Sequence, residues 1–506
     1  MREPLDIVIV GGGTAGWMCA AALSSTVDPA LYRISLVESD EILTVGVGEA
    51  TLPQMKDFND YIGIIEADMM SKTNATFKLG IEFINWGFQN SSYIHPFGVH
   101  GKPIGGVEFH NQWVRANLAG YSNNVEDFSY AITACRHKKF DFPTNDPESI
   151  NATYSYAYHF DALLYARYLR QFSEKLGLTR IEGKIIDVKC HPESGDITTL
   201  HLESGQMITG DLFIDCSGFR GLLIEQALQT GWEDWSHWLP CDRAIAVPCE
   251  RTKELLPYTQ SIACDAGWQW RIPLQNRIGN GYVFCSEFMN ADEATTSILD
   301  TLEGPALAEP KVISFKAGRR LKSWNKNCIT LGLSSGFLEP LESTSIYLIQ
   351  IAIMNLLQLL PRKNIDPALS TEFNRRVGDE YERVRDFLIL HYHANTKGGK
   401  GLWEYCQNME IPDSLSHRMA EFKHRGYLRK QVEGLFSPPS WLAVYLGQGI
   451  IPTHYDRLAN NMPLKDAIAE MKNLQSSIIE RVQTMPDHID FLADYCPSID
   501  QAGSSS

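Results

Sequence analysis

The chain has 506 residues, of which 44% are hydrophobic and 21% are charged, and its formal net charge is −16. These fractions are typical of globular proteins, and the length predicts two or three domains or one large catalytic body with insertions. The acidic balance argues against a nucleic-acid partner, which would favour a basic surface. Eleven cysteines occur without a C-x-x-C pair. We therefore expect no metal cluster and no redox disulfide, and a cytoplasmic location.

The N-terminal residues predict no signal peptide, because Met1–Pro4 leads directly into an apolar, strand-like segment. The most apolar stretch of the chain, residues 345–360, is interrupted by three amide side chains and stops at Pro361. A membrane span needs about 20 nearly uninterrupted apolar residues. This stretch therefore predicts a buried helix in the core, and we expect no membrane association.

A glycine motif follows the first predicted strand, residues 6–10, and precedes a predicted helix, residues 17–24. In a nucleotide-binding loop of this kind, Gly11 permits the tight turn and Gly13 lets the backbone approach a pyrophosphate. Gly16 allows close packing of helix and strand. The pyrophosphate would lie at the helix N-terminus, beside Thr14 and Ala15. The alternative is a glycine-rich turn that binds no ligand.

An acidic residue ends the second predicted strand, residues 32–37. Glu38 lies 22 residues beyond Gly16, close to the spacing expected for a carboxylate that binds a ribose 2′-hydroxyl. This acid favours FAD or NAD over NADP. A later strand and small-residue turn, residues 209–218, resembles the second FAD fingerprint of glutathione-reductase-like flavoproteins. The segment 184–188, which ends in Val188, resembles the strand beside the adenine. Without the first motif, these two segments could equally be an ordinary strand and turn.

Further segments resemble the flavin-dependent halogenases of the tryptophan halogenase family. The loop 47–53, V-G-E-A-T-L-P, matches that family's G-E-A-T-x-P sequence, and residues 268–273, W-Q-W-R-I-P, match its W-x-W-x-I-P signature. Residues 331–344 match its flavin and halide segment, and residues 157–162 and 409–414 are also similar. The resemblance implies that reduced FAD, oxygen and a halide, bromide or chloride, halogenate an electron-rich aromatic ring.

The resemblance also implies a set of site residues. Lys78 matches the essential lysine, which guides hypohalous acid to the substrate, and Glu342 matches the second catalytic residue. Backbone N–H groups of Thr344 and Ser345 would hold the halide at a helix start. His95 and Phe97 would stack on an indole-type ring. The predicted cofactor-binding residues are Gly11, Gly13, Thr14, Ala15, Gly16, Glu38, Gly48, Glu49, Ala50, Val188, Gly332 and Ser343.

Structural roles stay open for several of these residues. A lone lysine is usually a solvated surface charge. Glu342 could instead complement the dipole of the following helix, His95 could be a loop histidine beside packed aromatic residues, and the signature tryptophans could fill the core. His391 and His393, two positions apart on a predicted helix, point to different faces, so we expect no metal site there.

The resemblance favours an α/β fold, with a Rossmann-like FAD-binding body of the glutathione-reductase and para-hydroxybenzoate-hydroxylase type. We predict that residues 1–100 and 150–350 form this discontinuous body with substrate-side insertions. Residues 101–149 would form an insertion and residues 365–500 a mostly helical substrate lobe.

No second dinucleotide loop is visible in the sequence. Reduced FAD would therefore come from a separate, transiently bound NADH-dependent flavin reductase. The segment 440–449 does not reproduce the clamp for the amino-acid group of free tryptophan, which leaves a simple indole, a peptide-bound or carrier-bound group, or a phenol as substrates. The sequence leaves a homodimer open. Two other functions stay open: a flavin-dependent aromatic monooxygenase, and a flavin-binding protein without catalysis.

Overall fold

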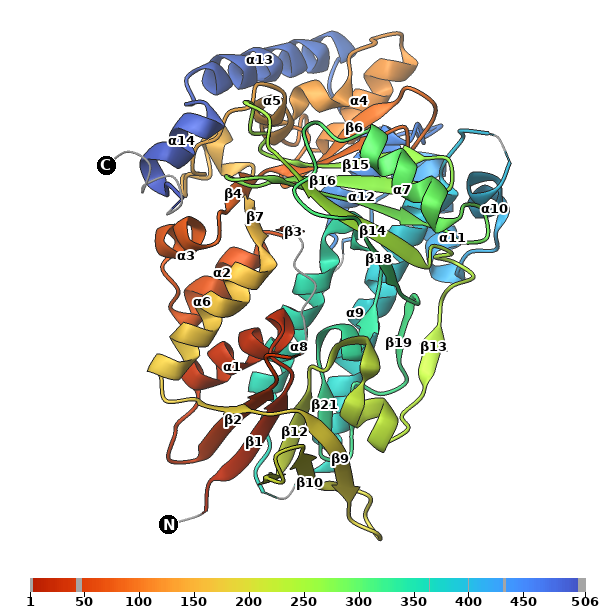
Figure 1. Cartoon of the computed structure of the whole chain (residues 1–506). Coiled ribbons are helices and arrows are strands. Elements are labelled where there is room, and N and C mark those ends of the chain that lie inside the picture. Colours follow the sequence, from red (N-terminus) through yellow and green to blue (C-terminus); the bar gives the residue numbers. More distant parts are fainter. Residues whose placement is uncertain (1–2, 42–47, 364, 399, 431–433, 499–506) are drawn as a thin grey trace. The chain divides into compact units, whose positions relative to one another are not determined.

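The computed structural model describes residues 3–41, 48–363, 365–398, 400–430 and 434–498 (Figure 1). The chain divides into two units, each assembled from three separate segments. The first unit consists of Met1–Ala75, Phe160–Asp242 and Ser314–Glu382. The second consists of Thr76–His159, Arg243–Ile313 and Arg383–Ser506. These boundaries differ from the ranges that the sequence predicts. The assignment of FAD binding and substrate binding to the predicted ranges stays a prediction.

A six-stranded sheet lies at the centre of the first unit, in the order β20-β21-β12-β1-β2-β8. Every neighbouring pair is parallel except β20 and β21. The nearly continuous apolar sequence of β1, L-D-I-V-I-V, fits its central place, because a parallel strand is covered on both faces. The strands are β1 (Leu5–Val10), β2 (Tyr32–Glu38), β8 (Thr179–Glu182), β12 (Leu212–Asp215), β20 (Trp324–Asn325) and β21 (Cys328–Thr330).

Helices and two small sheets complete the first unit. Helix α1 packs against α6 and α8, and the carboxylate of Asp161 caps α6 by accepting from the backbone N–H groups of Leu163 and Leu164. The helices are α1 (Thr14–Thr26), α2 (Gln54–Ile62), α3 (Glu66–Lys72), α6 (Ala162–Lys175) and α8 (Thr344–Gln358). The remaining strands are β3 (Gly48–Ala50), β9 (Ile185–Cys190), β10 (Ile197–Leu202), β11 (Met207–Thr209), β13 (Trp232–Asp234), β19 (Gly318–Arg320) and β22 (Gly336–Phe337).

A seven-stranded sheet in the order β18-β14-β17-β16-β15-β5-β6 organises the second unit. Strands β15, β16 and β17 form an antiparallel meander, β14 pairs with β17 in antiparallel register, and β5 pairs with β15 in parallel register. The strands are β5 (Gly80–Ile84), β6 (Ser92–Pro96), β14 (Arg243–Cys249), β15 (Thr259–Cys264), β16 (Gly267–Pro273), β17 (Ile278–Phe284) and β18 (Lys311–Ser314). A shorter strand, β4 (Thr76–Lys78), pairs with β7 (Ala157–Asp161) in antiparallel register.

The described residues from 367 to 495 form mostly helices. Helix α9 (Pro367–His393) runs through the boundary between the two units, and later helices belong to the second. These are α10 (Leu402–Asn408), α11 (Asp413–Arg425), α12 (Pro438–Gly447), α13 (Leu464–Gln483) and α14 (His488–Tyr495). Helices α4 (Phe109–Leu118), α5 (Tyr130–Arg136) and α7 (Ala291–Asp300) come from the earlier segments. The predicted α/β fold class is confirmed.

The apolar segment 345–360 forms most of α8, where ten side chains are buried. Among the helices that the structure describes, none combines the length and the apolar character needed to cross a bilayer.

Candidate functional site

The glycine motif joins β1 to α1 as the sequence predicts. Gly11 has a φ of +109°, and a Cβ there would lie 2.4 Å from the carbonyl oxygen of Cys216. A Cβ on Gly16 would lie 1.9 Å from the carbonyl oxygen of Gly11, so both positions require glycine. A Cβ on Gly13 meets no atom within 4 Å, and Gly13 caps the N-terminus of α1. The open space at this helix start fits a pyrophosphate group.

Glu38 ends β2 close to the glycine motif. A Cβ on Gly12 would lie 1.4 Å from Oε2 of Glu38, so this carboxylate lies directly against the loop. The other oxygen, Oε1, accepts a hydrogen bond of 2.6 Å from Nε of Arg180. The carboxylate is therefore held in place beside the loop by a side chain of β8, as binding of a ribose hydroxyl requires.

The second fingerprint surrounds the buried carboxylate of Asp215 at the end of β12. Its two oxygens accept backbone N–H bonds from Ser217 at 2.9 Å, Leu223 at 2.7 Å and Ile224 at 2.8 Å. These bonds fix the turn after β12. Val188 on β9 packs against the hydrophobic cluster that contains residues of β1 and β2.

Gly332 approaches the same loop from a later segment of the first unit. Its φ is +65°, and a Cβ there would lie 2.8 Å from the Cβ of Ala15. The fold thus brings together residues far apart in sequence that the resemblance assigns to the cofactor.

Glu49, in β3, keeps part of its surface open to solvent, yet desolvation by surrounding protein atoms raises the pKa of its carboxyl to about 7. Gly48 and Ala50 on either side are buried.

The start of α8 carries the predicted halide residues. Ser343 adopts the left-handed conformation with a φ of +59° and caps the helix, whose first residue is Thr344. Glu342 and Thr344 are fully buried, and Ser345 is half-buried. The hydroxyl of Thr344 has no hydrogen-bond partner in the described part of the chain. An anion at this helix start would find backbone N–H groups and a buried hydroxyl.

In the second unit, Lys78 ends β4 and is fully buried. Its Nζ lies 5.1 Å from the ring centroid of Phe97, within the range of a cation–π interaction. The backbone N–H of Phe97 donates to the carbonyl of Leu79 at 2.8 Å, which fixes this neighbourhood. Full burial is the opposite of the surface position that a lone lysine usually takes.

A buried histidine holds the strand that carries Lys78. The Thr76 hydroxyl donates to the Pro273 carbonyl at 2.7 Å, so its oxygen can accept from Nδ1 of His159 at 2.8 Å. Nε2 of His159 then accepts from the Thr259 hydroxyl at 2.9 Å. Desolvation, the charge of Lys78 and the nearby His488 hold the pKa of His159 far below its ordinary value. The imidazole is therefore neutral and adds no second positive charge beside Lys78.

His95, on β6, belongs to an aromatic cluster. Its ring centroid lies 5.8 Å from that of Phe387 on α9, and Phe387 stacks on Phe436 at 3.8 Å. Trp441 on α12 meets Phe387 edge-on at 4.9 Å. Sequence reasoning found His95 but missed the other three rings. No sequence spacing links them, because they come from separate segments that only the fold brings together.

The signature tryptophans lie on β16. Trp268 is fully buried and its ring centroid lies 6.1 Å from that of Trp270. A Cβ on Gly281 would lie 1.9 Å from the Trp270 ring, so this indole lies directly on the neighbouring strand. Both rings have the packing role that the sequence left open as an alternative.

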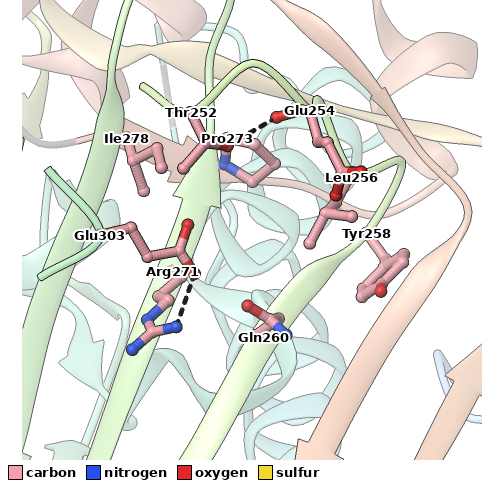
Figure 2. A pocket seen from close by; sticks show the side chains of 9 residues that line it. All are labelled: Thr252, Glu254, Leu256, Tyr258, Gln260, Arg271, Pro273, Ile278 and Glu303. Carbon is pink, nitrogen blue, oxygen red and sulfur yellow. Dashed lines mark hydrogen bonds and ion pairs between the residues drawn. The ribbon is translucent and has the colours of Figure 1, made fainter. Parts of the chain in front are cut away.

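A pocket of about 380 Å³ lies elsewhere in the second unit (Figure 2). Arg271, one of its lining residues, binds Glu303 at 2.7 Å and the carbonyl of Thr301 at 2.8 Å, and Gln260 donates to Glu82 at 2.8 Å. These polar groups already have protein partners, and none of the predicted catalytic, cofactor or substrate residues lines this pocket. It is lined by Thr252, Glu254, Leu256, Tyr258, Gln260, Arg271, Pro273, Ile278 and Glu303.

Among the described residues, no group of histidine, cysteine, aspartate and glutamate is arranged to hold a metal ion.

Comparison with known proteins identifies the family of the chain. The family model described as tryptophan halogenase matches residues 6–464. The flavin-dependent halogenase Xcc4156 from Xanthomonas campestris is 44% identical and superposes with a TM-score of 0.94, over 98% of this chain and 99% of that one. The flavin-dependent halogenase BrvH from Brevundimonas sp. BAL3 is 41% identical with the same TM-score, over 98% and 100%. The tryptophan 6-halogenase ThaL from Streptomyces albogriseolus is 34% identical, over 88% and 90%.

Proposed function

Because the chain belongs to the tryptophan halogenase family, a family of flavin-dependent enzymes that halogenate aromatic substrates, we propose that it uses reduced FAD, oxygen and chloride or bromide to halogenate an indole-type ring. The observation that carries this proposal is the complete burial of Lys78 beside Phe97. A desolvated ammonium has no solvent partners that compete with a small reactive molecule. A flavin monooxygenase has no need of a buried lysine at this place.

We propose that the first unit binds the cofactor and the halide. Gly13 leaves room at the start of α1 for the pyrophosphate, and Glu38 lies beside that loop. Backbone N–H groups at Thr344 and Ser345 would hold the halide. Reduced FAD, when bound, supplies the electrons with which oxygen converts a halide into hypohalous acid. We propose that a separate NADH-dependent flavin reductase provides it.

The remaining roles belong to residues of this chain. The ammonium of Lys78 donates a hydrogen bond to hypohalous acid and polarises it toward the ring. The buried carboxylate of Glu342 stabilises the cationic ring and accepts its proton. His95 and Phe97 offer aromatic surfaces to the substrate, whose own electron density must supply the nucleophile. Neutral His159 fixes the strand of Lys78 through Thr76.

Mass spectrometry of an indole reaction tests the proposal. The mixture contains enzyme, FAD, NADH, a flavin reductase, and chloride and bromide in competition. We expect a product with a bromine or chlorine isotope pattern that disappears in Lys78→Ala, while oxygen consumption continues. Lys430→Ala is the matched control, because that side chain is 83% exposed, and it should behave as the unaltered enzyme. A product heavier by one oxygen would instead identify a monooxygenase. No flavin-dependent product from a panel of indoles and phenols would favour a non-catalytic flavin-binding protein.

A further inference from the structure

Helices α11 and α12 of the second unit pack through two side-chain pairs. Arg418 lies over Trp441, with its guanidinium carbon 4.0 Å from the ring centroid. One turn further along both helices, Phe422 stacks on Tyr445 at 4.3 Å. Because residues four apart share a helix face, Arg418 and Tyr445 belong to the same contact between the two helices.

The guanidinium of Arg418 and the hydroxyl of Tyr445 lack hydrogen-bond partners among the described residues. Arg418 is half-buried and forms no hydrogen bond or ion pair within the part of the chain that the structure describes. The Tyr445 side chain is fully buried, and its hydroxyl has no partner among the described residues. Desolvation lowers the pKa of Arg418 and raises that of Tyr445.

The two carboxylates whose charges act on Arg418, Asp386 and Glu421, are hydrogen-bonded to other side chains. Asp386 accepts from Nη2 of Arg385 at 2.8 Å and from the Ser414 hydroxyl at 2.6 Å. Glu421 accepts from Nε of Arg429 at 2.6 Å. A guanidinium that is partly desolvated and lacks an anionic partner is costly to bury, and a carboxylate that binds it side-on would offset that cost. A buried phenol hydroxyl gains a comparable benefit from an acceptor.

This pair lies at one end of the aromatic cluster. Trp441 contacts both the Arg418 guanidinium at 4.0 Å and the Phe387 ring at 4.9 Å, and Phe387 lies 5.8 Å from His95. We propose that Arg418 and Tyr445 form an anion subsite that binds the carboxylate of an aromatic acid whose ring lies in this cluster. The subsite names the substrate class within the proposed function and rests on it. Because both neighbouring carboxylates are already paired, the subsite selects an acid rather than an amine or an amino acid.

Competing substrates test the subsite directly. Halogenation of indole-3-propionate, indole and tryptamine is compared for the unaltered enzyme, Arg418→Gln and Tyr445→Phe. We expect Arg418→Gln to lower the ratio of kcat/KM for indole-3-propionate to that for indole by roughly tenfold or more, and Tyr445→Phe by roughly threefold to tenfold. Arg418→Lys should restore part of the loss. Arg425→Gln, on the same helix but exposed, is the matched control and should leave the ratio unchanged.

Calorimetric titration of the oxidised enzyme with indole-3-propionate provides a reading that needs no turnover. The Kd should rise in Arg418→Gln by about the same factor as the kinetic ratio falls. Equal losses for indole and indole-3-propionate would show that Arg418 only packs against Trp441, and would overturn the subsite. A preference for tryptamine over indole-3-propionate would also overturn it. If indole-3-propionate binds through Arg418 while no arene is halogenated, the subsite stands and the proposed function fails.

Discussion

Glu49 gives a stability prediction whose sign and size follow from burial. Desolvation raises the pKa of its carboxyl from the ordinary value of 4.5 to about 7. Between these values the folded protein keeps a proton that the unfolded chain has lost, so the free energy of unfolding falls as the pH rises from 4.5 to 7. At about 1.36 kcal/mol for each pH unit, the loss is at most about 3.4 kcal/mol. Since Glu49 retains some solvent exposure, we expect about 1–3 kcal/mol.

The variant Glu49→Gln removes this titration while it keeps the shape of the side chain. We expect the variant and the unaltered apoprotein to melt at similar temperatures near pH 4.5. The variant should become increasingly more stable up to pH 7, and the difference should then stay constant. Thermal melting across this range measures the effect. Glu203→Gln, at an exposed position, is the control and should show a flat difference. A flat difference for Glu49→Gln, or a less stable variant at pH 8, would refute the reasoning.

Three further predictions concern buried or crowded positions. Gly13→Ala should leave the melting temperature of the apoprotein unchanged but weaken FAD binding in a fluorescence titration. Gly16→Ala should instead destabilise the fold by roughly 2 kcal/mol or more, and equal melting temperatures for the two variants would contradict this. Thr344→Val should leave the free energy of unfolding unchanged or raise it by about 1 kcal/mol, because the hydroxyl has no partner among the described residues. The KM for halide should change by no more than a few-fold, because the proposed halide donors are backbone N–H groups. A large loss of stability would reveal a partner of the hydroxyl. His159→Phe should cost about 2–4 kcal/mol in chemical denaturation, because two buried hydroxyls lose a partner; an unchanged midpoint would exclude that role.

Elements with a strong local pattern were predictable from the sequence. The apolar run before Gly11 became β1, and the segment that ends in Glu38 became β2. The apolar stretch 345–360 became α8, which begins at Thr344 and ends at Gln358. In each case the apolar spacing and a nearby glycine or proline determine where the element begins and ends. Contacts with distant parts of the chain are not needed to predict it.

Positions set by long-range packing were not predictable in this way. Composition and spacing predict that a lone lysine lies at the surface, and only the family resemblance assigned a catalytic role to Lys78. Its burial depends on β4 pairing with β7 and on the hydrogen bonds around His159. Arg418 and Trp441 likewise meet only because α11 and α12 pack against each other. Such contacts join segments that carry no common sequence pattern.

The two units prepare their parts of the proposed chemistry by different physical means. In the first unit the means are mainly backbone conformations, such as the positive φ values of Gly11 and Ser343, which most side chains would strain. In the second unit the means are side chains, such as the rings of Phe387 and Trp441, whose size a substitution can increase or decrease. Backbone sites tolerate few substitutions, whereas aromatic surfaces can change shape at a modest cost in stability. Changes of substrate range should therefore arise from substitutions in the aromatic cluster, while the glycine positions of the first unit stay fixed.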